Sequence, residues 1–200
     1  SMSEKPESEE FEDEDGEEVP VLGHPIRGLT DGYSGVGRFS RMCTKALDDL
    51  LGPLDREPTA GSRVGFFLHV SDHYLKRAQA AWEEHGDAFR EQEEILSSEW
   101  EGQAAFLRSV TDRLLPVLSE RNGFEPSNVV LSEGGAPGFV ATLELAAEAL
   151  ARGRFDQVVV GAVDSLLETS MLETMAQLDI LKTPGRPTGI MPGECAAFLL

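Results

Sequence analysis

Residues 127–165 decide the fold, and they read SNVVLSEGGAPGFVATLELAAEALARGRFDQVVVGAVDS. The stretch holds two short apolar runs, at 128–131 and 158–160, and each predicts a buried strand. Between them a glycine-rich turn leads to Pro137, a residue that suits the first position of a helix. The Ala/Leu-rich segment that follows predicts a helix over 139–151. Two strands joined by one helix indicate a parallel pair within an α/β fold.

Similar patterns lie on both sides of this unit. A continuous apolar run at 64–70 predicts a strand that is covered on both faces, as in a parallel sheet. A last run at 194–200 predicts a fourth strand. We therefore expect one α/β domain over 19–200, with a mostly parallel sheet flanked by helices. Helical spacing of apolar residues places further helices at 38–51, 74–85, 100–118 and 165–178.

The first 18 residues hold ten acidic side chains and one basic side chain, that of Lys5. Because like charges repel and the segment has little to bury, we expect a disordered acidic tail over 1–18. The formal net charge of −19 argues against a nucleic-acid partner, since phosphate binding needs clustered Lys and Arg. No apolar run is long enough to predict a membrane span. Two cysteines and an acidic N-terminus without a signal segment predict a cytoplasmic protein.

Three motifs in the second half of the chain resemble those of the β-ketoacyl synthases, members of the thiolase-like superfamily. The first is the strand, turn and helix that ends in ALARG at 149–153. The second is FDQVVVGAVDS at 155–165, which is similar to the family's D-x-x-L-V-G-G-V-D-S strand and turn. The third is MPGECAAFLL at 191–200, similar to the family's P-G-E-G-A-A-x-L-L turn into a strand. The chain thus resembles the N-terminal half of a thiolase fold.

The resemblance implies a nucleophilic cysteine where the second strand meets its helix, because the helix dipole there favours a thiolate. Counting back from Gly153 places that position at Ala136, which has no group that can attack. We therefore predict no catalytic residue at this position, and we expect no cofactor and no metal. Ser132 could replace the cysteine only with a shifted register and a base. The candidate binding residues are those of the turn before the helix, Ser132, Glu133, Gly134, Gly135 and Ala136.

The remaining reactive side chains match no catalytic pattern. The resemblance places two histidines, or a histidine and an asparagine, in the C-terminal half of the family's fold, and the histidines here do not correspond to them. His69 and His73 straddle a strand end and a helix start, so they share no helical face that could bind a metal. His24 and His85 lie in loop-like sequence. Cys195 stands where the family has a small residue, and we interpret it as a packing substitution.

The favoured hypothesis is a catalytically inactive ketosynthase-like protein that acts as a dimerising scaffold or a partner-binding accessory subunit. One half of a thiolase fold exposes apolar faces, at a cost of about 25 cal/mol per Å². We therefore expect a homodimer, a heteromer with a ketosynthase-like partner, or packing against a C-terminal half of its own. An acyl-carrier or accessory protein is a further expected partner.

Two alternatives stay open, because a fold by itself does not decide a function. The first is an active acyltransferase of the 3-oxoacyl-ACP synthase type, with an atypical nucleophile or with a site completed by a C-terminal half. The second is a module that binds an acyl chain without chemistry.

Overall fold

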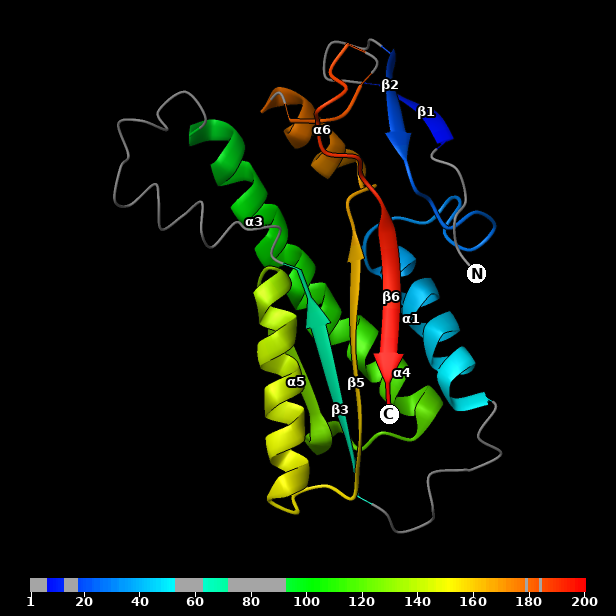
Figure 1. Ribbon diagram of the computed structural model, residues 1–200, viewed down its shortest axis with the longest axis vertical. Helices are drawn as coiled ribbons and strands as arrows, with labels where there is room; N and C mark the ends of the chain where they lie inside the picture. Colours follow the sequence, from blue (N-terminus) through cyan, green and yellow to red (C-terminus); the bar gives the residue numbers. More distant parts are fainter. Residues whose placement is uncertain (1–6, 13–17, 53–62, 72–92, 179, 184) are drawn as a thin grey trace.

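The structure is a computed structural model that describes residues 7–12, 18–52, 63–71, 93–178, 180–183 and 185–200. Its centre is a four-stranded sheet with helices on both faces (Figure 1). The strands of this sheet, in spatial order, are β4 (Val129–Glu133), β3 (Val64–Val70), β5 (Gln157–Ser165) and β6 (Glu194–Leu199). The helices are α1 (Gly35–Leu51), α3 (Glu93–Ser109), α4 (Leu115–Asn122), α5 (Ala136–Ala151) and α6 (Thr169–Gln177).

β3 lies at the middle of the sheet and organises it. It pairs in parallel with β4 on one edge and with β5 on the other, while β6 runs antiparallel to β5. Its bounds are those of the predicted strand, and all of its residues except Val64 are buried. The prediction of an α/β fold with a mostly parallel sheet is therefore confirmed.

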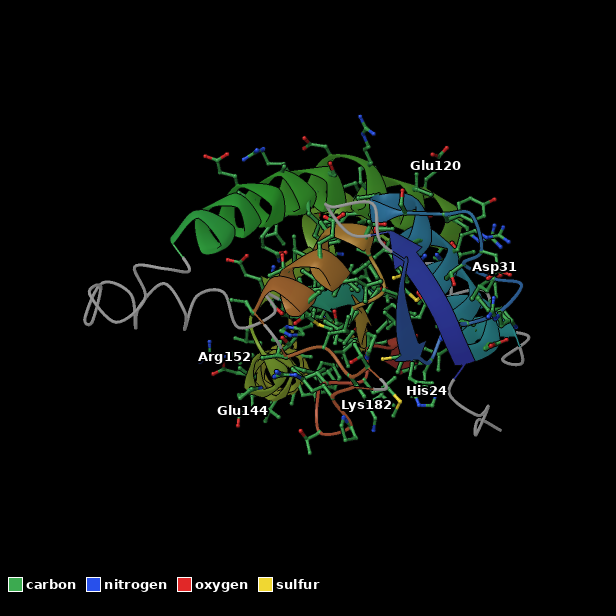
Figure 2. The ribbon with its side chains drawn as sticks, turned by 90° about the horizontal axis from the view of Figure 1, so that it is seen from above. His24, Asp31, Glu120, Glu144, Arg152 and Lys182 are labelled. Atoms are coloured by element: carbon green, nitrogen blue, oxygen red, sulfur yellow. The ribbon has the colours of Figure 1, made fainter. Side chains whose placement is uncertain are left out.

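Period-two alternation along the strands sends side chains to two separate cores. On one face, Phe66, Leu68 and Val70 of β3 pack with α1, α4 and the π-helical turn between α3 and α4. On the other face, Phe67 packs with Val158 and Val160 of β5 beneath α5. Figure 2 shows these layers from above, with α3 on one side of the sheet and α5 on the other.

Several predicted helices differ from the observed ones at their ends. The helix expected from residue 165 begins at Thr169, because Ser165 is the last residue of β5 and its hydroxyl bonds the Glu194 carboxylate at 3.3 Å. The helix expected over 100–118 is part of a longer helical run from Glu93 to Asn122. The helix expected over 74–85 lies outside the described residues. Among the helices that the structure does describe, each is too short or too polar to pass through a bilayer.

Part of the segment expected to be disordered is ordered. Residues Glu7–Glu12 form β1, which pairs antiparallel with β2 (Glu18–Gly23) from Glu7 opposite Gly23 to Glu12 opposite Glu18. For Glu7–Glu12 a paired strand thus stands where the sequence predicts disorder, and residues 1–6 and 13–17 lie outside the described residues. The physical reason is that an antiparallel ladder satisfies backbone groups whatever the charge of the side chains, and composition alone does not reveal a ladder.

A buried carboxylate, that of Glu194, joins the N-terminal segment to the sheet. One of its oxygens accepts hydrogen bonds from the Ile26 amide at 2.8 Å and from the Thr30 hydroxyl. The other accepts from Arg38 Nη1 at 2.8 Å and from the Ser165 hydroxyl at 3.3 Å. The Glu194 side chain is fully buried, so these partners replace the water that its charge has lost.

Arg38 connects this carboxylate to a second one. Its Nε lies 3.2 Å from Glu168 Oε1, although the N–H itself donates to the Tyr33 carbonyl at 3.0 Å. The other Glu168 oxygen accepts from the Gly35 amide at 2.9 Å, at the start of α1. The guanidinium therefore holds together the loop before α1, the start of α6 and the start of β6.

We expect Arg38→Met to lower the free energy of unfolding by about 3–5 kcal/mol, because it leaves the buried Glu194 carboxylate without its cation. Arg121→Met is the matched control. Its ion pair with Asp48, at 3.0 Å, is about half exposed, so the expected loss is at most about 1 kcal/mol. Urea unfolding of both variants measures the difference. Equal losses would contradict the structural role given to Glu194.

Candidate functional site

The carboxyl ends of β3 and β4 bring a histidine and a serine together. His69 and Ser132 are register partners in the parallel ladder, and both lie on the sheet face that α5 covers, the face of Phe67 and Val130. His69 Nδ1 is 2.9 Å from Ser132 Oγ. The strand pairing therefore supplies Ser132 with the base that the sequence alone did not reveal.

Thr142 of α5 completes the cluster from above. Its hydroxyl oxygen lies 2.5 Å from Ser132 Oγ and 3.5 Å from His69 Nδ1. The same oxygen lies 2.9 Å from the Gly138 carbonyl oxygen of its own helix, so Ser132 Oγ and this carbonyl compete for the single Thr142 proton. His69 is 4 % exposed and Thr142 is 1 % exposed, whereas Ser132 is only half-buried. Three polar side chains thus meet at the edge of an otherwise apolar layer.

The hydrogen bonds assign the tautomer of His69. Nε2 lies 3.1 Å from the carbonyl oxygen of Gly134, and a carbonyl can only accept, so Nε2 carries the proton. In the neutral ring Nδ1 is then unprotonated, and it faces the Ser132 hydroxyl at 2.9 Å. This arrangement makes Ser132 the donor and His69 Nδ1 the acceptor, and the Thr142 hydroxyl then donates to Ser132 Oγ.

The turn after β4 is built from glycines for steric reasons. Gly134 has φ +146°, a conformation that side chains rarely adopt, and in it the carbonyl reaches His69. Gly135 is the N-cap of α5, and the helix begins at Ala136. A Cβ on Gly138 would lie 2.7 Å from His69 Cε1, so only glycine leaves room for the ring.

Of the five predicted binding residues, the structure brings two into the cluster. Ser132 joins it through its hydroxyl and Gly134 through its carbonyl. The Glu133 side chain is exposed at the end of β4, and Gly135 and Ala136 form the start of the helix.

Sequence reasoning missed His69 and Thr142. The signal for His69 was its place as the polar residue in the apolar run 64–70, on the same alternating face as Phe67. Thr142 gave a weaker signal, since a threonine inside an Ala/Leu-rich helix often bonds its own backbone. His73, which was weighed together with His69, lies outside the described residues.

The cysteines lie elsewhere. Cys195 is exposed on β6 and does not fill a core, which corrects its interpretation as a packing substitution. Partial burial first, and then the carboxylates of Asp164 and Glu194, raise the pKa of its thiol. Burial also raises the pKa of Cys43, which lies on the buried face of α1. Neither environment favours a thiolate nucleophile.

Within the described residues the site has no metal-ligand cluster, and no known relative assigns it a chemistry. Among the residues that the structure describes, no three His, Cys, Asp or Glu side chains gather as a metal site would require. Comparison of the chain with protein-family models, with curated proteins and with solved structures finds no match.

We expect Gly138→Ala to destabilise the protein, because forcing a methyl group against the fixed ring of His69 costs about 1–3 kcal/mol. The gain in helix propensity, at most about 1 kcal/mol, offsets this only in part. Gly102→Ala in α3 is the control, since a Cβ there meets nothing within 4 Å and should stabilise. Thermal unfolding compares them, and a stabilised Gly138→Ala protein would show that His69 is not fixed.

Proposed function

We propose a function from one observation, which is that α5 is apolar nearly all round but, within the part of the chain that the structure describes, is covered by the sheet on one side only. Its charged residues are Glu144 and Glu148. Val140 is 56 % exposed and Leu145 is 50 % exposed. A helix with apolar residues on all sides is typical of one that is buried on all sides. α5 thus has the composition of a helix between two layers.

The edge strand β6 also exposes apolar residues, on the same side of the sheet as α5. Phe198 of β6 is buried in the core beneath α1, so by alternation Cys195, Ala197 and Leu199 lie on the α5 face, and all three are exposed. Leu199 pairs with Val160, and Val160 packs in the core beneath α5. The exposed strip on β6 therefore continues the outer surface of α5. Adjoining apolar surface of this kind marks an interaction site.

We propose that this chain is a ketosynthase-like protein with the N-terminal half of a thiolase fold, in which a second copy covers the free face of α5. The resemblance of residues 127–200 to that family supports the proposal, because its two similar halves pack their helices between sheets. The start of α5, where the family has its cysteine, is Ala136. The protein would then serve as a cytoplasmic dimerising scaffold or accessory subunit that has lost the condensing reaction.

The double substitution Val140→Glu and Leu145→Glu tests this interface. We expect the unchanged protein to sediment as a dimer in analytical ultracentrifugation, and the variant as a monomer, because two acidic side chains would be buried without partners. Both residues are exposed in the single chain, so its own fold should survive.

Val117→Glu on α4 is the control, because Val117 is equally exposed, at 51 %, but lies on the opposite side of the sheet. This variant should remain dimeric. An unchanged protein that stays monomeric at every concentration would contradict the proposed self-association, and association through another thiolase-like chain would then have to be tested directly.

A further inference from the structure

The His69–Ser132 pair meets the geometric requirements of a nucleophile with its base. Such a pair needs a hydroxyl within about 2.6–3.2 Å of the base, and a third group that orients the base. Ser132 Oγ is 2.9 Å from His69 Nδ1, and the Gly134 carbonyl holds the far side of the ring at 3.1 Å. The Gly134 carbonyl thus fixes which nitrogen faces the serine.

The place of His69 in the sheet is a second observation. The chain leaves β3 for β4 through α3 and α4 on one face, and then crosses through α5 on the other face to β5, on the far side of β3. In open α/β sheets ligands bind beyond the carboxyl ends of the strands, at the point where the strand order reverses. That point lies between β3 and β5, so His69, at the carboxyl end of β3, borders it, and half-buried Ser132 lies on the other side of β3, on β4.

We infer that Ser132 is a nucleophile and His69 its general base, in a site that accepts an acyl group from an activated ester or thioester. This activity goes beyond the proposed scaffold role and does not depend on it. It requires no cysteine at the start of α5.

The step balances without any further reagent. Ser132 Oγ attacks the acyl carbonyl carbon while its proton passes to His69 Nδ1, and the bond from carbon to the leaving sulfur or oxygen breaks. His69 then returns the proton to the leaving group, which departs as a thiol or an alcohol, and the acyl group remains as an ester on Ser132. The Nε2–H bond to the Gly134 carbonyl stabilises the imidazolium formed between the two transfers.

Neighbouring groups position the Ser132 hydroxyl and set the polarity of its surroundings. Thr142 is a positioning residue, because its hydroxyl holds Ser132 Oγ at 2.5 Å. α5, a 16-residue helix, begins at Ala136, soon after Ser132 in the chain, so its positive end lies at the same end of the sheet as the serine. The Phe139 ring, whose centroid is 6.1 Å from that of His69, makes the surroundings apolar and favours an uncharged acyl group.

The test is to incubate the protein with p-nitrophenyl butyrate and, separately, with S-butyryl-N-acetylcysteamine, and to record the intact mass and the modified peptide. We expect one butyryl group on Ser132 from at least one donor, and the donor that reacts distinguishes an ester from a thioester site. Ser132→Ala should abolish the adduct. Ser127→Ala, a control at an exposed serine just before β4, should leave it unchanged.

His69→Gln should slow acylation of Ser132 by about 10²-fold or more, because a general base contributes at least this much. The mapped adduct on the unchanged protein decides the matter even if this variant fails to fold. No adduct with either donor, or an adduct that persists in Ser132→Ala, would overturn the inference and leave a structural hydrogen-bond cluster. Acylation and dimerisation are read separately, so either proposal can fail without the other.

Discussion

A central strand that is buried on both faces and paired on both edges constrains everything around it. Any polar side chain in β3 must find its hydrogen bonds inside the protein, because water does not reach it. His69 is that side chain, and its partners come from β4, from the following turn and from α5. The position of α5 over the sheet, the glycine at 138 and the conformation of Gly134 are all consistent with this requirement.

The two proposals concern opposite sides of α5. Its inner face carries Thr142 and covers the serine–histidine pair. Its outer face exposes Val140 and Leu145, and Glu144 and the C-cap residue Arg152 also point away from the sheet (Figure 2). A second layer on the outer face would therefore leave the contacts of His69 in place. The same helix can serve an assembly and a reactive serine.

Much of the fold could be predicted from the sequence, because its strands are short continuous apolar runs. The run at 64–70 gave a strand with the bounds that the structure has. Strand pairing could not be predicted in the same way, since a pattern along one strand does not name its neighbour. For this reason the order of the sheet, the ladder of β1 with β2 and the contact between His69 and Ser132 all required the structure.

The candidate site, too, could be predicted from the sequence only in part. The glycine-rich turn and Ser132 could be found from their place between a strand and a helix, and Ser132 was named as a nucleophile that would need a base. The base came from a residue 63 positions earlier in the chain, which only the parallel ladder brings close. The similarity to the ketosynthases stays a proposal that rests on the motifs of residues 127–200.

The most direct test of this account is the protonation pattern of His69, measured by long-range ¹H–¹⁵N correlation NMR on protein labelled at histidine. The geometry predicts that the neutral ring carries its proton on Nε2, bonded to the Gly134 carbonyl, and that the unprotonated Nδ1 accepts from Ser132. A single slowly exchanging Nε2–H tautomer would support it. A proton on Nδ1, or a ring that averages between the two tautomers, would contradict it, since Ser132 would then have no base.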